Sequence, residues 1–302
     1  MKIKYILLLI LPFMLSVSCS EWTEPRPVEF PGVHPWEKDP DAWAEYTAAL
    51  REYRTTPHNI IYVRLKNSPE SFSSEKYSLR CIADSVDIVS LANSQNISQN
   101  DVEDLPLMKE KGIRVLYQFD YASRSGEFAD MAALEAALDE AIAAVARYGL
   151  DGWSFTGIYK WGDKVSQDAA ALIFDKLNSA KDAAQLLVFE GNPQFVTEKD
   201  RRKLDYTVLD TEGIQRTGTI ATMASSAVGS GILAKKLLLT ASVGTFILDN
   251  EMKEADAVGQ MAEFLLSSGQ YAGLAVYDVE DDYYSPDGNY LQLRAAIQML
   301  NR

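Results

Sequence analysis

Acidic, amide and aromatic residues recur directly after apolar runs that have the length of β-strands. These residue types suit sugar recognition, because an aromatic ring stacks on the apolar CH face of a pyranose while carboxylate and amide oxygens accept hydrogen bonds from its hydroxyls. The candidates are Asp120, Tyr121, Tyr159, Trp161, Glu190, Asn192, Asp210, Glu212, Tyr277 and Asp278. They predict a site for an oligosaccharide, although aromatic residues such as Tyr159 and Trp161 would also serve simply to cover the rim of a barrel.

The apolar runs alternate with helical segments along most of the chain. The eight runs occupy residues 60–65, 86–91, 113–119, 152–156, 186–189, 206–209, 237–240 and 274–277. Helical periodicity occurs in residues 41–53, 105–111, 131–148, 169–177, 255–266 and 291–300. It is clearest in 131–148, where Leu134, Leu138 and Ile142 share one face behind a capping Asp130. This alternation is typical of parallel βαβ units.

Eight strands with intervening helices predict an α/β fold, a (β/α)8 TIM barrel built by a single domain over residues 41–302. The alternative is a doubly wound open sheet. Against it, residues 65–69 read Leu-Lys-Asn-Ser-Pro after the first strand, without a glycine-rich phosphate-binding fingerprint. In a barrel the carboxyl ends of all strands meet at one mouth, so the candidate residues are expected to gather there.

Charge and composition narrow the classes of partner. The formal net charge is -14 and the sequence pI is near 4.7, which argues against a nucleic acid or an anionic membrane surface as the main partner. Two cysteines and two histidines provide neither a disulfide framework nor the ligands of a zinc site. We therefore expect neither a metal nor a cofactor.

Three segments carry a resemblance to a known family. Residues 83–91 (Ala-Asp-Ser-Val-Asp-Ile-Val-Ser-Leu), 111–116 (Lys-Gly-Ile-Arg-Val-Leu) and 148–152 (Tyr-Gly-Leu-Asp-Gly) resemble family 18 glycoside hydrolases. They are most similar to the endo-β-N-acetylglucosaminidase-like lipoproteins encoded in glycan-utilisation loci of gut Bacteroidota. The resemblance implies a barrel fold and a ligand that contains N-acetylglucosamine.

The fourth strand departs from the family's catalytic motif. That motif reads approximately Asp-Gly-x-Asp-x-Asp-x-Glu, and residues two apart on a strand point to the same side. Its Glu is the general acid, and the Asp before it orients the substrate's acetamide, the nucleophile. This chain retains Asp151 but places Ser154, Thr156 and Ile158 at the three inward positions. Hydroxyl and aliphatic groups supply neither the proton nor the charge.

These replacements predict a glycan-binding protein on a catalytically inactive barrel. In the family a tryptophan commonly lies under the reactive sugar at strand eight, where this chain has Tyr277, which keeps an aromatic face. Two alternatives remain open. One is a glycosidase whose chemistry has moved to other carboxylates, such as Asp120, Glu190 or Asp210. The other is a structural subunit that docks on an outer-membrane transporter and has no sugar site.

The amino terminus predicts export and lipid anchoring. Lys2 and Lys4 precede an apolar run over residues 5–17, which suits a signal peptide over residues 1–18. Small residues stand directly before Cys19, which resembles a loose bacterial lipobox with this thiol as the lipid carrier. Residues 19–40 are acidic and proline-rich, like the tethers of Bacteroidota surface lipoproteins, so we expect a lipoprotein of the outer membrane exposed at the cell surface. The alternative is an ordinary secretion signal with an incidental cysteine.

Overall fold

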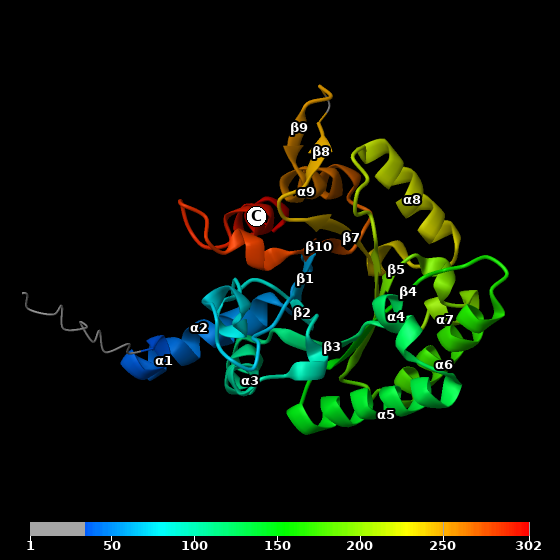
Figure 1. The fold of residues 1–302 in the computed structure, drawn as a ribbon. Coiled ribbons are helices and arrows are strands. Elements are labelled where there is room, and N and C mark those ends of the chain that lie inside the picture. Colours follow the sequence, from blue (N-terminus) through cyan, green and yellow to red (C-terminus); the bar gives the residue numbers. More distant parts are fainter. Residues whose placement is uncertain (1–33, 250, 302) are drawn as a thin grey trace, which may run out of the picture. The chain divides into compact units, whose positions relative to one another are not determined.

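The computed structural model describes residues 34–249 and 251–301 and divides into two compact units, residues 1–44 and 45–302 (Figure 1). The predicted signal peptide and Cys19 lie outside the described residues. In the described part of the predicted tether, Pro35–Lys38 form the short helix α1, and α2 follows at Pro40–Tyr53. Among the described residues, no helix has the length and apolar character that a membrane span requires.

The second unit contains a closed barrel of eight parallel strands, which confirms the predicted (β/α)8 fold. The strands are β1 Ile60–Leu65, β2 Ile88–Leu91, β3 Arg114–Phe119, β4 Gly152–Gly157, β5 Leu186–Gly191, β6 Tyr206–Leu209, β7 Leu237–Ser242 and β10 Gly273–Tyr277. Each pairs with its sequence neighbours, and β10 pairs with β1 to close the ring. The carboxyl ends therefore share one face, where a barrel presents its site.

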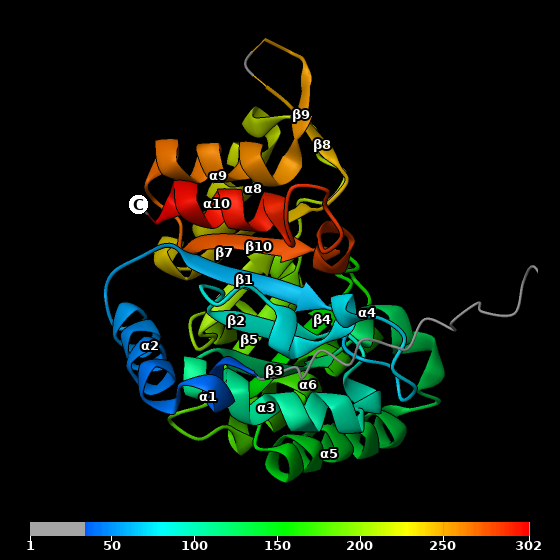
Figure 2. The same cartoon turned by 90° about the vertical axis from the view of Figure 1, so that its left-hand side faces the viewer.

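Helices follow the strands around the barrel. They are α3 Gln99–Lys111, α4 Tyr121–Arg124, α5 Met131–Tyr148, α6 Lys164–Ala180, α7 Glu198–Arg201, α8 Thr217–Gly229, α9 Ala257–Ser268 and α10 Leu291–Leu300. Figure 2 shows α9 and α10 side by side, and α9 contacts β10. The predicted cap of α5 is confirmed, because the Asp130 carboxylate accepts a hydrogen bond from the Ala133 amide at 2.9 Å.

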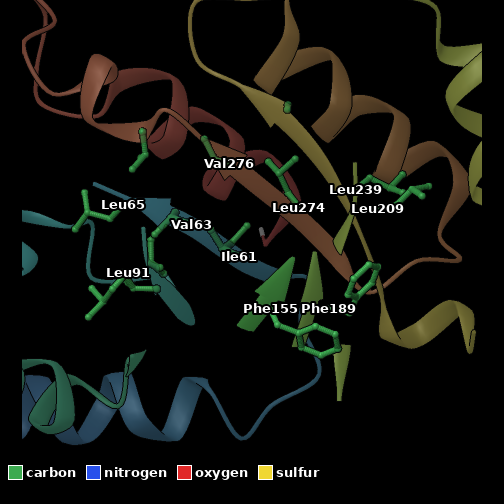
Figure 3. Close-up of a cluster of buried hydrophobic side chains, with 14 of the residues drawn as sticks. Ile61, Val63, Leu65, Leu91, Phe155, Phe189, Leu209, Leu239, Leu274 and Val276 are labelled. Carbon is green, nitrogen blue, oxygen red and sulfur yellow. The ribbon is translucent and has the colours of Figure 1, made fainter. Parts of the chain in front are cut away.

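The period-2 alternation of the strands divides the core into two layers. On β1, Ile61, Val63 and Leu65 belong to the outer layer between strands and helices, which Figure 3 shows in part. Tyr62 lies between them in sequence but belongs to the inner layer inside the barrel. The same alternation on β4 sends Phe155 outward and Ser154 inward.

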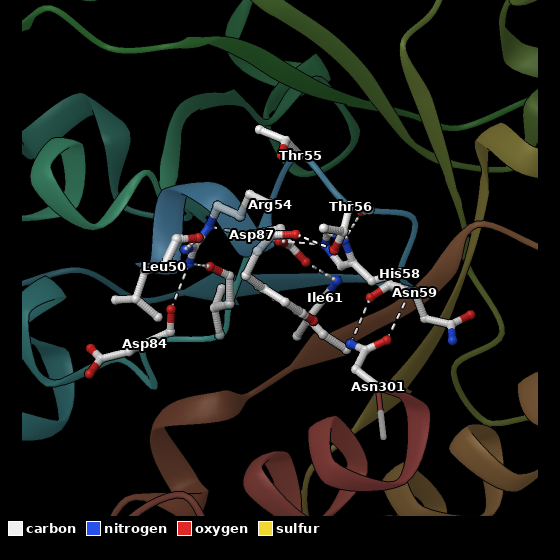
Figure 4. Close-up of polar contacts among 12 residues, drawn as sticks. Leu50, Arg54, Thr55, Thr56, His58, Asn59, Ile61, Asp84, Asp87 and Asn301 are labelled. Carbon is white, nitrogen blue, oxygen red and sulfur yellow. Dashed lines mark hydrogen bonds and ion pairs between the residues drawn. The ribbon is translucent and has the colours of Figure 1, made fainter. Parts of the chain in front are cut away.

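A polar network ties the amino end of the barrel together (Figure 4). One oxygen of the buried Asp87 carboxylate accepts from the Ile61 amide at 2.8 Å, and the other lies 3.0 Å from His58 Nε2. Arg54 donates to the Asp84 and Val86 carbonyls at 2.6 and 2.7 Å. Arg54, the residue that follows α2, is thereby fastened to the segment that leads into β2.

Helix α8 and a small sheet after β7 are among the elements that were not predicted from the sequence; the short helices α4 and α7 are others. Helix α8 has the sequence TGTIATMASSAVG, in which threonine, serine and glycine lower helix propensity and only small side chains and Ile220 are buried. A two-stranded antiparallel sheet, β8 Phe246–Leu248 and β9 Glu254–Asp256, follows β7. Both lie beside the barrel mouth. Residues of α8 line one cavity there, and residues of β8 line another.

Candidate functional site at the barrel mouth

A cavity of about 410 Å³ opens at the carboxyl ends of the strands. Seven of the ten predicted residues line it, and they come from the ends of β3, β4, β5, β6 and β10: Asp120, Tyr159, Glu190, Asn192, Asp210, Glu212 and Tyr277. The other lining residues include Arg64, Ser123, Thr156 and Ile158. Closure of the barrel thus brings together side chains that are separated by up to about two hundred residues in the sequence.

The other three predicted residues do not line this cavity. Tyr121 is only 8% exposed and packs between Phe128 and Phe195, with ring centroids 6.0 and 5.9 Å away. The structure therefore places Tyr121 outside the predicted site, because its ring is enclosed by two other aromatic rings. Asp278 forms an ion pair with Lys66 at 3.0 Å, and Trp161 is 90% exposed on the loop after β4.

Strand β4 presents no carboxylate to the cavity. Thr156 and Ile158 line it, and Ile158 is 51% exposed. Ser154 lies deeper in the barrel, where its hydroxyl is 2.8 Å from the Ser90 hydroxyl. Asp151, at the opposite end of the strand, accepts a hydrogen bond from the Val115 amide at 2.9 Å. Ser154 thus lies inside the barrel, and Thr156 and Ile158 lie at its mouth.

Glu190 supplies a carboxylate to the cavity floor from β5. It is 3% exposed and pairs in register with Thr156 on the neighbouring strand. Its Oε1 accepts from Tyr62 at 2.7 Å, Gln118 at 2.9 Å and Ser90 at 3.1 Å, and its Oε2 accepts from Tyr277 at 2.7 Å. Four donors from four strands therefore hold this carboxylate in one orientation.

The two phenols that contact Glu190 remain protonated donors. Burial raises the pKa of Tyr62 and of Tyr277 well above the ordinary tyrosine value, and the charge of Glu190 raises both further. A protonated phenol donates one hydrogen bond, and each of these two phenols donates it to Glu190. Glu190 and its donors thus form a fixed polar floor beneath the cavity.

Asp120 is a second carboxylate of the cavity, and it is held by local donors. Its Oδ1 accepts from Thr156 Oγ1 at 2.6 Å and from the Ser123 amide at 3.3 Å, while the Ser123 hydroxyl donates to Oδ2. Burial opposes ionisation, but the hydrogen bonds from Ser123 and Thr156 outweigh it and lower the pKa of Asp120. The group is therefore an ionised acceptor at neutral pH.

Arg64 on β1 is a cavity residue that the sequence analysis missed. Its guanidinium carbon lies 3.6 Å from the centroid of the Tyr277 ring. Burial would lower the pKa of Arg64, but the neighbouring Tyr277 and Glu190 raise it above the usual arginine value. The available signal was its position two residues after Tyr62 in an otherwise apolar strand, which places both side chains on the inner side.

The cavity offers one open aromatic side chain for stacking. Tyr277 was expected to provide such a face, but it is 3% exposed and one of its faces lies under Arg64. Tyr159 lines the cavity and is only partly buried. Within the described residues, no cluster of three or more His, Cys, Asp or Glu side chains is placed to hold a metal ion.

Comparisons with known proteins agree with the barrel and with the predicted resemblance. The sequence model of glycoside hydrolase family 18, BT1044-like, matches residues 23–130, a stretch that ends before β4. No curated protein matches the chain in sequence. Beyond residue 130, the similarity to known proteins therefore rests on the fold.

Three solved structures share that fold at low sequence identity. A selenomethionine BT1044 variant with a Glu-to-Gln substitution has a TM-score of 0.72 and 19% identity, covering 88% of this chain and 95% of its own. An endo-β-N-acetylglucosaminidase double mutant from Cordyceps militaris, in complex with fucosyl-N-acetylglucosamine-Asn, gives 0.65 and 18%, with 85% and 95% coverage. A chitinase from Bacteroides thetaiotaomicron gives 0.61 and 11%, with 80% and 96% coverage.

These findings confirm what the strand motifs predict: the chain resembles family 18 glycoside hydrolases, in sequence over residues 23–130 and in fold over its whole (β/α)8 barrel.

Proposed function

We propose that the barrel mouth binds glycans containing N-acetylglucosamine and does not cleave them by the family 18 route. The observation that carries the proposal is the cavity itself, which keeps polar and aromatic lining while β4 contributes Thr156 and Ile158 at the positions of the family's acids. The solved relative that holds fucosyl-N-acetylglucosamine-Asn supports the ligand class. Binding needs the cavity, whereas catalysis needs a positioned proton donor.

The chemistry of β4 argues against hydrolysis. A general acid must lie within hydrogen-bond reach of the glycosidic oxygen and must carry a proton to give. Ile158 has none, and the Thr156 hydroxyl is already engaged with Asp120. Losing positioned acid–base catalysis costs roughly 10² to 10⁴ in rate, and losing the orienting charge costs more.

A glycosidase with relocated carboxylates is the second candidate, favoured by the presence of Asp120 and Glu190 in one cavity. The hydrogen bonds of Glu190 weigh against it, because both of its oxygens already accept from protein donors. Asp120 is held ionised, which suits a base or a ligand acceptor but not a proton donor. The carboxylates are therefore assigned to binding and to the structure of the floor.

The test uses the soluble chain that begins at Ser20, in binding and hydrolysis assays run side by side. A glycan array and calorimetry with chitin oligosaccharides and N-glycan cores measure binding, and mass spectrometry of long incubations measures new reducing ends. We expect binding without product, and Tyr159→Ala should weaken it by about tenfold, equivalent to ~1.4 kcal/mol. The matched control is Tyr284→Ala, since Tyr284 is exposed and lies outside the cavity lining.

Other outcomes select among the alternatives. Release of sugar by the wild-type protein would establish the relocated glycosidase. Silence on the array, together with co-purification of an outer-membrane transporter, would establish the structural subunit without a sugar site.

We also propose that Cys19 carries the lipid anchor and that the barrel is displayed at the cell surface on the outer membrane. Metabolic labelling with a fatty acid should mark the wild-type chain and not Cys19→Ser. Accessibility of the barrel to protease added to intact cells checks the surface location, and full protection would contradict it.

A further inference from the structure

The cavity contains one basic side chain whose hydrogen-bonding capacity is unused. Within the described part of the chain, Arg64 has its ring contact with Tyr277 but neither an ion pair nor a hydrogen bond. A guanidinium carries five N–H donors in a planar fork and accepts none. Leaving such donors unpaired in a partly enclosed site is unfavourable unless a ligand or water supplies acceptors.

The protein holds the Arg64 guanidinium in a fixed place. Its central carbon lies 3.6 Å from the centroid of the Tyr277 ring, and Tyr277 in turn donates to Glu190 at 2.7 Å. Glu190 is anchored by three further donors on other strands. Because each member of this chain is buried or packed, Arg64 loses little additional side-chain freedom on binding a ligand.

We infer that Arg64 and Asp120 together bind one neutral group of the glycan that both accepts and donates hydrogen bonds, either an acetamido group or a pair of neighbouring hydroxyls. This inference rests on the proposed glycan-binding function. The acceptor of that group binds Arg64, and its donor binds the Asp120 carboxylate, which can only accept when ionised.

The charge of the cavity excludes an acidic sugar at this position. Its lining contains the four acids Asp120, Glu190, Asp210 and Glu212 against the single base Arg64. A ligand carboxylate or sulfate would gain one attraction, to Arg64, but would face repulsion from several acids of the same lining. A neutral donor–acceptor group satisfies Arg64 and Asp120 without that cost.

The experiment compares three classes of probe by calorimetry at low and high salt: N,N′,N″-triacetylchitotriose, mannotriose and a sialylated trisaccharide. We expect the wild-type protein to bind a neutral probe with little salt dependence, because no net ligand charge is screened. Arg64→Gln and Asp120→Asn should each weaken that binding at least tenfold. A loss confined to triacetylchitotriose identifies the acetamido group, and an equal loss with mannotriose identifies the hydroxyl pair.

Controls separate this inference from the proposed function. Arg216→Gln changes an exposed arginine outside the cavity and should leave affinity unchanged, and circular dichroism melting verifies that every variant is folded. Arg64→Lys keeps the charge but loses the fork, so it should recover only part of the affinity. If the wild-type protein binds none of the probes, the proposed function fails. If it binds them but Arg64→Gln is neutral, or if the sialylated probe binds best and weakens with salt, only the Arg64 inference is overturned.

Discussion

The side chain of Ile158 occupies the position where the predicted motif alignment expects a proton donor, yet it is not buried. It is 51% exposed and lines the cavity, so the backbone still delivers this position to the barrel mouth. Ser154, four residues earlier, has a different environment, because its hydroxyl is enclosed and bonded to Ser90, which itself donates to Glu190. Position 158 should therefore tolerate a charged side chain, whereas position 154 should not.

We expect an acidic substitution to change the free energy of unfolding by different amounts at the two positions. Ile158→Glu should change the free energy of unfolding by less than about 0.5 kcal/mol, since the side chain is half exposed. Ser154→Asp should cost about 3 kcal/mol or more, because it buries a second carboxylate close to Glu190 without a cation partner. Urea denaturation measures the free energy of unfolding of both variants. A similarly small loss in both would show that the interior tolerates the extra charge. Neither single change should release sugar, because Thr156 still supplies no carboxylate.

His58 gives the barrel a pH-dependent contribution to stability. Its hydrogen bond to Asp87 raises the pKa of His58 above about 6.5, against the opposing effect of burial. A raised folded-state pKa means that the contribution is fully present below the unfolded-state value of about 6.5. It is lost as the pH rises through the higher folded-state pKa.

The unfolding free energy should therefore decrease through this window above pH 6.5, and His58→Gln should flatten that part of the profile. Chemical denaturation at closely spaced pH values checks this expectation. A slope that survives in the His58→Gln variant would assign it to another group.

At the level of elements, the strands were predictable and the polar floor was not. All eight barrel strands were found from their apolar runs, because strands buried on both sides carry continuous hydrophobic sequence. Helix α8 was missed because serine, threonine and glycine hide its periodicity. Gln118 was missed because its acceptor lies on another strand, and Arg64 because its contact is the ring of Tyr277 on β10. Only closure of the barrel brings these together around Glu190.

Glycine at the start of β4 is required by the pairing of β4 with β5. Gly152 has φ +126°, and a Cβ there would lie 2.1 Å from the Leu186 carbonyl oxygen. Gly152→Ala should therefore destabilise the barrel by several kcal/mol, about 3 or more, through backbone strain and a clash with backbone atoms. Thermal and urea unfolding measure the loss.

Gly218→Ala provides the matched control in α8. A Cβ at this exposed helical position meets nothing within 4 Å, so alanine should stabilise by about 0.5–1 kcal/mol. If both glycine variants changed the free energy of unfolding by the same amount, the close approach of β4 to β5 would not contribute to stability.

At the level of the whole barrel, the mouth cavity shares lining residues with two neighbouring cavities. Asn192 and Asp210 also line a cavity of about 380 Å³ beside α8. Glu212 also lines a cavity of about 290 Å³ next to β8. Elements that the sequence did not reveal, α8 and the β8–β9 sheet, thus extend the face on which a glycan would lie.

If the barrel mouth binds a glycan as proposed, this shared lining predicts that affinity increases with the length of the glycan. A single sugar would occupy the mouth cavity alone, whereas a longer chain would also contact the apolar surface of Leu209, Pro193 and Met223 in the neighbouring cavity. Burying that surface contributes about 25 cal/mol per Å². The dissociation constant should therefore fall stepwise from monosaccharide to at least trisaccharide in a calorimetric series of N-acetylglucosamine oligomers.

A bulky substitution on α8 tests which cavity the longer chain enters. Thr222 is exposed and lines the cavity beside α8, so Thr222→Trp should fill that space and abolish the gain from chain length while leaving monosaccharide affinity unchanged. Ser225 is exposed on the same helix but does not line the cavity, which makes Ser225→Trp the matched control with full length dependence. Length dependence that persists in Thr222→Trp would instead direct the chain past Glu212 into the cavity next to β8.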